Sequence, residues 1–433
     1  MPDTPQVWLN DTQVNPVDAT NPFSYYNPTV TQLTNGNIVV VYDDNGGRSA
    51  DGGPSHWRLY DPVGTVIASG VTDDSAGNPI VVALGDGGFM IADDYATGLT
   101  TGSVVEAWRY DADGTFQNYA AIDNRLWAGI GDEPSDNRLQ ASAANDINTM
   151  IVYTAYDGGI YGQLYARIYT PALGLVGPEL QIASPGDPFN GPNLVYGNAH
   201  IAGVDAVALA NGNYAVAYGV SNGLSGSSEV SNVQVVIFND VGTQIIEQTV
   251  IDNGLANTDP SITALEGGGL VVTWTLDGTG GTDSGIRLKV LDGAGSPLTG
   301  TINPLTTTTG NQNEPVVAAL ADGGFVVIWD DDNLSDIKGQ RFDAFGNRIG
   351  TEFTIDAAGS QTAIEVVGLE DGRFAVTWQE SDQIRMEFYD VRDLPTLMDY
   401  DGANLQIGTT GNDVMTDVAV GADRIYGNGG NDR

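Results

Sequence analysis

Acidic side chains recur directly after short apolar segments of this chain, at places that correspond to one another. These places carry Asp43, Asp44, Asp93, Asp94, Tyr156, Asp157, Asp330, Asp331, Asp332 and Asp336. Converging carboxylates repel one another unless a divalent cation lies between them. We therefore expect either a Ca²⁺-assisted ligand site or a solvated acidic rim. In the first interpretation the ligand-binding residues are Asp43, Asp44, Asp94, Tyr156, Asp157 and Asp330, and the metal ligands are Asp331, Asp332 and Asp336.

A second group of residues combines the side chains that move protons and neutralise charge. A polysaccharide lyase needs a base, an acid and a cation, and His, Tyr and Arg supply these types. The candidates are His56, Arg58, Tyr60, Arg109 and His200. Arg58 and Tyr60 alternate with apolar neighbours in one segment, so packing is the simpler explanation for them. Trp127, in a long polar segment, could stack on a sugar ring or fill a gap in the core.

Composition excludes several other chemistries. The 433 residues include 56 Asp and Glu but only 16 Lys and Arg, a formal net charge of −40, which argues against a nucleic-acid partner. No Cys is present, which excludes disulfides and thiol nucleophiles, and two His cannot form a three-His metal site. No apolar run approaches the roughly 18 residues of a membrane span, and the first residues do not resemble a signal peptide.

Known catalytic motifs are also missing. The sequence contains no Ser-x-Asp-x-Gly-x-Thr-Trp box of sialidases, no Gly-x-Ser-x-Gly elbow, no phosphate-binding loop of the Walker type and no His-Glu-x-x-His pair. The chemistry of this chain must therefore be sought in its architecture.

The elements that position these residues form a repeat. Each copy has an anchor, usually Leu, before a glycine turn: Leu33, Leu84, Ala144, Leu209, Leu265, Leu320 and Leu369. Nine residues after the anchors stand Tyr42, Asp93, Tyr153, Tyr218, Trp274, Trp329 and Trp378. The intervening segments are short and rich in β-branched and aromatic residues, which predicts strands. Four antiparallel strands recurring every ~50 residues indicate a seven-bladed β-propeller, and two tandem β-sandwiches are the alternative.

The two ends of the repeat complement each other. The last copy stops at Tyr389–Asp390 after its third strand, while residues 6–10 resemble a fourth strand without a partner. We predict that residues 6–10 pair antiparallel with 384–389, so that residues 1–12 close the last blade. The predicted domains are a propeller at 1–393, a linker at 394–407 and a separate tail at 408–433.

The tail repeats a glycine and aspartate pattern. Gly411-Asn412-Asp413, Gly421-Ala422-Asp423 and Gly430-Asn431-Asp432 recur at intervals of ten and nine residues. This pattern resembles the nonapeptide of RTX (repeats-in-toxin) proteins, which wind a parallel β-roll around Ca²⁺. The resemblance implies that Asp413, Asp423 and Asp432 are calcium ligands. The ten-residue interval and the absence of glycine between Thr416 and Val420 depart from the family pattern.

The propeller copies resemble repeats of secreted RTX proteins as well. The shared motif is ALxDGGFVVxW followed by FDxxG, over roughly 28–390 and most strongly over 259–390. The resemblance implies a secreted or cell-surface protein that leaves a bacterium by type I export and binds Ca²⁺. An acidic chain without Cys agrees with that route.

These observations predict a secreted binding or adhesion module for a glycan, the extracellular matrix or a cell-surface protein. One alternative is an extracellular polysaccharide lyase or hydrolase. Another is a surface-layer or filament subunit that self-assembles. Neither a nucleic-acid partner nor a membrane span is expected.

Overall fold

The computed structural model of this chain is built from β-strands. It describes residues 4–15, 24–44, 54–72, 76–96, 103–123, 138–155, 163–183, 200–221, 231–251, 257–276, 284–306, 309–332, 335–356, 361–391, 399–400, 405–407 and 424–426. No helix occurs within these ranges, and hence none that is long and apolar enough to cross a membrane. The predicted all-β fold is confirmed.

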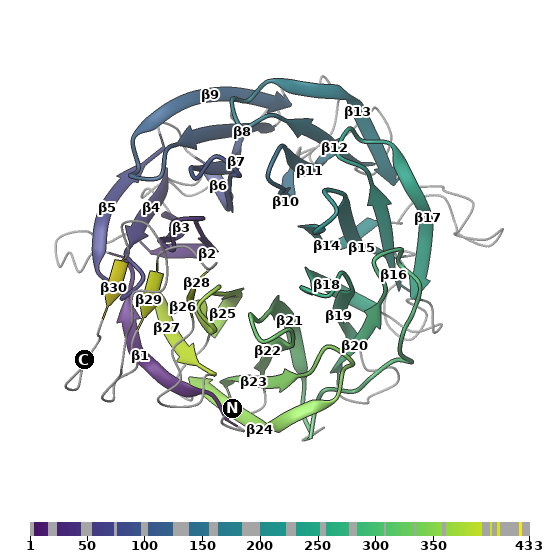
Figure 1. Cartoon of the computed structure of the whole chain (residues 1–433). Helices are drawn as coiled ribbons and strands as arrows, with labels where there is room; N and C mark the ends of the chain where they lie inside the picture. The colour runs from purple at the N-terminus through teal and green to yellow at the C-terminus, as the bar shows by residue number, and fades with distance from the viewer. Residues whose placement is uncertain are drawn as a thin grey trace.

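Seven antiparallel sheets stand around a central axis, as Figure 1 shows. In blades one to six the strands run in chain order from the axis outwards. Blade one contains β2 (Tyr25–Gln32), β3 (Ile38–Asp44), β4 (Ser55–Tyr60) and β5 (Val66–Val71). Blade two contains β6 (Ala76–Ala83), β7 (Phe89–Ala96), β8 (Ser103–Tyr110) and β9 (Phe116–Asp123). Blade three contains β10 (Arg138–Ala144), β11 (Thr149–Ala155), β12 (Gln163–Tyr169) and β13 (Leu175–Ala183).

The other four blades complete the ring. Blade four contains β14 (His200–Ala208), β15 (Tyr214–Ser221), β16 (Ser231–Phe238) and β17 (Gln244–Ile251). Blade five contains β18 (Asn257–Ala264), β19 (Leu270–Leu276) and β20 (Gly285–Leu291). Blade six contains β21 (Gln312–Ala319), β22 (Phe325–Asp331), β23 (Asp336–Phe342) and β24 (Arg348–Asp356). Blade seven contains β25 (Gln361–Gly368), β26 (Arg373–Glu380), β27 (Gln383–Asp390) and, from the N-terminus, β1 (Gln6–Gln13). The seven-bladed propeller is confirmed.

Two kinds of tight turn connect the strands on one face of the ring. After the anchor Leu33, the amide of Gly36 donates to the Leu33 carbonyl at 2.8 Å, and Gly36 has a φ of 82°, which favours glycine. Between the outer strands, Asp61 Oδ1 accepts the amide of Thr65 at 2.7 Å. The same arrangement recurs at Asp111, Asn239, Asp292 and Asp343. Because the strands are antiparallel, the ends joined by longer connections all lie on the opposite face.

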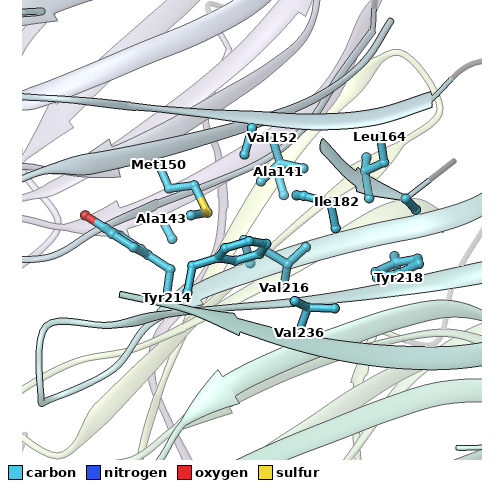
Figure 2. Close-up of a cluster of buried hydrophobic side chains, with 14 of the residues drawn as sticks. Ala141, Ala143, Met150, Val152, Leu164, Ile182, Tyr214, Val216, Tyr218 and Val236 are labelled. Carbon is cyan, nitrogen blue, oxygen red and sulfur yellow. The ribbon is translucent and has the colours of Figure 1, made fainter. Parts of the chain in front are cut away.

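The core lies between neighbouring blades. The aromatic residues near the end of the second strands are at most 1% exposed: Tyr42, Tyr153, Tyr218, Trp274, Trp329 and Trp378. Figure 2 shows one such cluster, in which Met150 and Ile182 of blade three pack with Tyr214 and Val216 of blade four. The predicted burial of the aromatic repeat is confirmed. Asp93 holds this position in blade two, where it is fully buried and accepts a hydrogen bond from Ser55 Oγ at 3.1 Å.

The N-terminal strand closes the ring. β1 pairs antiparallel with β27, from Gln6 opposite Asp390 to Gln13 opposite Arg385. The predicted closing strand is therefore confirmed. Pairing continues beyond it, because the amide of Val14 donates to the Ile384 carbonyl at 2.8 Å.

A buried arginine fastens this junction. Arg373 of blade seven is fully buried, and its Nε donates to Asp371 Oδ2 at 2.8 Å. Its Nη2 donates to the Pro62 carbonyl of blade one at 2.6 Å. The guanidinium also lies 3.9 Å from the ring centroid of Trp8 on the closing strand. One side chain thus ties together blade one, blade seven and the N-terminus.

Two regions differ from the regular pattern. Blade five forms a three-stranded sheet, and the segment after β20 contributes only isolated bridges, at Leu291–Pro297 and Leu288–Ile302. Proline has no amide to donate, which disfavours a regular fourth strand there. Near the C-terminus, β28 (Asp399–Tyr400), β29 (Leu405–Ile407) and β30 (Arg424–Tyr426) form a small sheet, with β29 and β30 parallel. β28 and β29 fall within the segment predicted as a linker.

Candidate functional site

The inner strands are irregular near the face of the longer connections. In blade one the pairing of β2 with β3 shifts between Tyr26 and Thr29, and Asn27 has a φ of 49°. The same left-handed conformation occurs at Asn78, Gly203, Asp259, Glu314 and Ala363 on other inner strands. Among residues with a side chain, Asn and Asp tolerate this conformation best. These bulges place polar residues at the mouth of the central channel.

A cavity of about 210 Å³ lies at this mouth, between the inner strands of blades one, two, three and seven. Its lining is Asn27, Pro28, Thr29, Asn78, Pro79, Ile80, Leu139, Gln140, Ala363 and Glu365. The apolar residues form its walls, and two asparagines, a threonine, a glutamine and a glutamate supply the polar groups. This combination is typical of a site that binds a small polar molecule.

The two asparagines are joined to each other. Asn27 Nδ2 donates to Asn78 Oδ1 at 3.0 Å and lies 3.4 Å from Asp43 Oδ2. Burial raises the pKa of Asp43 to about 7, although the Asn78 backbone and the Asn27 amide favour its charged form. The predicted ligand residue Asp43 therefore supports the cavity from behind, through Asn27.

Glu365 is the acidic group of the cavity. Burial, and then the charge of Asp205, raises the pKa of Glu365 to about 8. No hydrogen-bond donor reaches its carboxyl among the residues that the structure describes. Glu365 therefore keeps its proton at neutral pH.

Asp205, on the inner strand of blade four, has a different environment. Its carboxylate accepts the amides of Ala206 at 2.7 Å and Ile262 at 2.8 Å, and the Ser261 hydroxyl at 3.1 Å. Burial raises the pKa of Asp205, while these three donors favour its charged form. Glu365 has no such donors among the residues that the structure describes. The two carboxyl groups of the channel therefore differ in their hydrogen-bonding environment.

Blades five and six carry a second acidic region. Burial, followed by the charges of Asp259 and Asp332, raises the pKa of Glu314. Burial and then Asp332 raise the pKa of Asp330 to about 7. The channel mouth is consequently divided into an amide-rich half at blades one to three and an acidic half at blades five and six.

The predicted metal ligands of blade six have separate surroundings. Asp331 is buried, Asp332 is exposed and accepts Asn313 Nδ2 at 2.8 Å, and Asp336 Oδ2 lies 3.9 Å from Lys338 Nζ. Within the described ranges, no group of three or more His, Cys, Asp or Glu side chains is placed to hold a metal ion. Calcium binding by Asp331, Asp332 and Asp336 therefore stays a prediction, as it does for the three aspartates of the tail.

Three of the predicted lyase residues come together in blade one. His56 Nε2 lies 2.7 Å from Asp44 Oδ2, and the His56 ring stacks on Tyr42 at a centroid distance of 5.5 Å. Burial raises the pKa of Tyr42 and of Tyr60, and the nearby charge of Arg58 offsets part of this effect. Tyr42 and Tyr60 belong to the core between blades one and seven, which supports the packing interpretation.

Arg109 lies elsewhere. It pairs with Asp86, in the turn between β6 and β7, on the face of the short turns. Arg341 and Asp322 form the equivalent pair in blade six at 2.7 Å. The structure therefore does not bring Arg109 to His56.

The remaining predicted residues are placed only in part. Asp94 is buried on β7. Trp127, Tyr156, Asp157, Asp413, Asp423 and Asp432, and the side chain of His200, lie outside the described part of the chain.

Sequence reasoning missed the residues of the cavity, although a signal was present. Thr29, Ile80, Gln140, Asp205, Ser261, Val316 and Glu365 each stand four residues before their anchor. Four of these seven line the cavity, and the charge of a fifth, Asp205, raises the pKa of Glu365. The repeat alignment therefore groups the residues four positions before each anchor, but the sequence does not show that this position faces the central axis.

Comparison with known proteins places the fold among solved structures. No family model and no curated protein sequence matches this chain. A protein of unknown function from Dyadobacter fermentans has 14% identity and a TM-score of 0.50, over 89% of this chain and 99% of the other. An α-L-arabinanase of Penicillium chrysogenum, solved with arabinobiose, has 12% identity and a TM-score of 0.52, over 89% and 99%. The GH93 α-L-arabinofuranosidase of Fusarium graminearum, also with arabinobiose, has 9% identity and a TM-score of 0.50, over 88% and 97%.

At these identities the likeness establishes the fold alone. The matched propellers nevertheless include enzymes that act on glycosides, over nearly the whole of both chains. This finding contradicts the leading prediction of a binding or adhesion module. Of the functions expected from the sequence, the alternative of an extracellular polysaccharide lyase or hydrolase is the one that agrees with the names of these structures.

Proposed function

We propose that this protein is a glycoside hydrolase whose active site is the mouth of the central channel. The observation that carries the proposal is a pair of carboxyl groups on inner strands with different environments: three donors reach Asp205, and none reaches Glu365 among the described residues. Glycosidic bonds are commonly cleaved by two carboxyl groups, one protonated and one ionised. Environments that separate the pKa values of such a pair assign their roles.

Each carboxyl group has one task in this proposal. Glu365, protonated at neutral pH, donates its proton to the oxygen of the leaving sugar. Asp205, whose carboxyl oxygens accept three hydrogen bonds, is the second group in this proposal and either activates a water molecule or attacks the sugar carbon itself. The anomeric configuration of the product distinguishes these two routes.

A hydrolase agrees better with the cavity than a lyase does. A lyase needs a cation to neutralise the carboxylate beside the carbon that loses its proton. The described lining of the cavity contains no Lys, Arg or His. His56, Arg58 and Tyr60 lie on the third strand of blade one rather than on an inner strand. The arabinoside-cleaving enzymes with this fold also support hydrolysis.

A substrate panel tests the proposal. The purified protein is incubated with fluorogenic glycosides and with polysaccharides, and released fluorophore and reducing ends are measured. A general acid typically contributes 10²–10⁴-fold to the rate, so we expect Glu365→Gln to lower kcat by about that factor. The control is Glu370→Gln, which removes an exposed carboxylate from the short-turn face of the same blade. Cleavage that is unaffected by Glu365→Gln would refute the role of this residue, and inactivity on the whole panel would refute the hydrolase.

The resemblance to RTX proteins supports a separate proposal about location and calcium. We propose that the protein is secreted by type I export and that its tail binds Ca²⁺ through Asp413, Asp423 and Asp432. Millimolar Ca²⁺ should then raise the melting temperature more than NaCl of the same ionic strength. Substituting all three aspartates by Asn should remove the difference. Equal melting in both salts would contradict the calcium proposal.

A further inference from the structure

We infer that the channel-mouth site accepts one uncharged sugar unit and rejects acidic sugars such as uronates and sialic acids. This inference rests on the proposed hydrolase function and specifies its substrate class. It follows from the polar groups that line the cavity, from the charges around it and from its size.

The free polar groups of the cavity are neutral. Asn27 Nδ2 donates one hydrogen bond to Asn78 Oδ1. Asn27 Oδ1 remains available as an acceptor and Asn78 Nδ2 as a donor. Gln140 makes no hydrogen bond among the described residues and offers both a donor and an acceptor. Thr29 Oγ1 accepts the Val81 amide at 3.2 Å, which leaves its proton free to donate. Mixed neutral donors and acceptors complement sugar hydroxyl groups, which both donate and accept.

The charges around the cavity are negative or titrate to negative. Glu365 lies in the lining, Asp205 acts on it across the channel, and Asp43 contacts Asn27 from behind. A carboxylate ligand would normally be held by a bidentate arginine. Four arginines on the third strands pair with other carboxylates: Arg109 with Asp86, Arg167 with Glu179, Arg341 with Asp322 and Arg385 with Glu380. An anionic sugar would therefore meet acidic groups in this lining, with no cationic side chain among the described lining residues to compensate its charge.

The size of the cavity limits how much of a substrate it holds. Sites for drug-sized ligands typically enclose roughly 300–1,000 Å³, whereas this cavity encloses about 210 Å³. Its apolar walls, formed by Pro28, Pro79, Ile80 and Leu139, suit the C–H faces of one sugar ring. The cavity consequently takes a terminal sugar unit, and the rest of a chain extends towards the face of the longer connections.

A paired set of substrates tests this specificity. The neutral 4-methylumbelliferyl glycosides are those of L-arabinofuranose, D-xylose, D-galactose and D-glucose, and the acidic ones are those of D-glucuronic acid and N-acetylneuraminic acid. We expect cleavage of at least one neutral glycoside, with kcat/KM at least 100-fold above either acidic one. Asn78→Leu and Gln140→Leu should each raise KM for that glycoside about 10-fold or more. Thr354→Ala, at an exposed position on the outermost strand of blade six, is the matched control.

A binding measurement separates the two proposals. Saturation-transfer NMR with the corresponding methyl glycosides is carried out on Glu365→Gln, which should bind sugar without cleaving it. If neutral glycosides bind, and Asn78→Leu abolishes this binding, but the wild type cleaves nothing, then the hydrolase is refuted and the inference stands. If the wild type prefers an acidic glycoside, then the inference is overturned and the hydrolase stands. Failure to bind any neutral glycoside by a variant with the wild-type melting temperature overturns the inference as well.

Discussion

Replacing Glu365 by Gln should change how the stability of the protein depends on pH. The pKa of Glu365 rises from its ordinary 4.5 to about 8, a difference of about 3.5. Each pKa unit between folded and unfolded states corresponds to about 1.4 kcal/mol. Folding therefore takes up a proton at this site, and the resulting stability is complete below pH 4.5 and is lost as the pH rises through 8. The loss amounts to about 5 kcal/mol at most, because water in the cavity screens part of the charge.

Gln resembles the protonated glutamate and cannot ionise. Wild type and Glu365→Gln should thus have similar unfolding free energies at pH 4.5, whereas at pH 9 the variant should be the more stable. Urea unfolding followed by tryptophan fluorescence measures this, since Trp274, Trp329 and Trp378 are buried between blades. The difference between the two proteins isolates Glu365 from Asp43 and Asp330, which titrate in both. Glu370→Gln is the exposed control. Parallel stability curves from pH 4.5 to 9 would refute the raised pKa of Glu365.

Three further predictions concern the core, the ring closure and the reaction. Trp329→Ala should destabilise the protein by about 3–5 kcal/mol and clearly lower the melting temperature; an unchanged melt would mean that this aromatic is not a blade contact. Arg373→Leu leaves Asp371 buried without its cation, which should destabilise the protein by about 3–5 kcal/mol. Hydrogen exchange should increase first in β1 and β27; a uniform increase would argue against a role of Arg373 in closing the ring. Asp205→Asn removes an acidic group near Glu365, which should lower the pKa of Glu365, so the residual activity should decline at a lower pH than in the wild type. If the alkaline side of the pH–activity profile does not move, then Asp205 does not influence Glu365.

The strands and their order were accessible from the sequence because they depend on local patterns. Alternation of apolar residues, glycine turns and an aromatic nine residues after each anchor predicted the blades, and the same offsets predicted the burial of Trp274, Trp329 and Trp378. The closing strand was predictable because the last copy has only three strands and residues 6–10 resemble a strand without a partner. The irregular outer segment of blade five was missed, although Pro297 marks where regular pairing ends.

The candidate site was less accessible because it depends on ring closure. Glu365 and Asp205 stand 160 positions apart, each a single acid in an apolar strand, and only the propeller brings both to the axis. The acidic residues after the second strands are adjacent in sequence and therefore form the more conspicuous pattern. The structure places Asp43 behind Asn27 and Asp44 against His56.

The sequence by itself determined the repeat, the number of blades and the way the ring closes, because each depends on periodicity and on pairing between strands. The tertiary structure decided which polar residues face a common cavity. That outcome depends on bulges at Asn27 and Asn78, which redirect the first residues of the inner strands. It also decided how the environments of the two carboxyl groups differ, because three donors reach Asp205 and none reaches Glu365 among the described residues. The pKa of a carboxyl group depends on its burial and on its distance from donors and other charges, and both are fixed only when the chain folds.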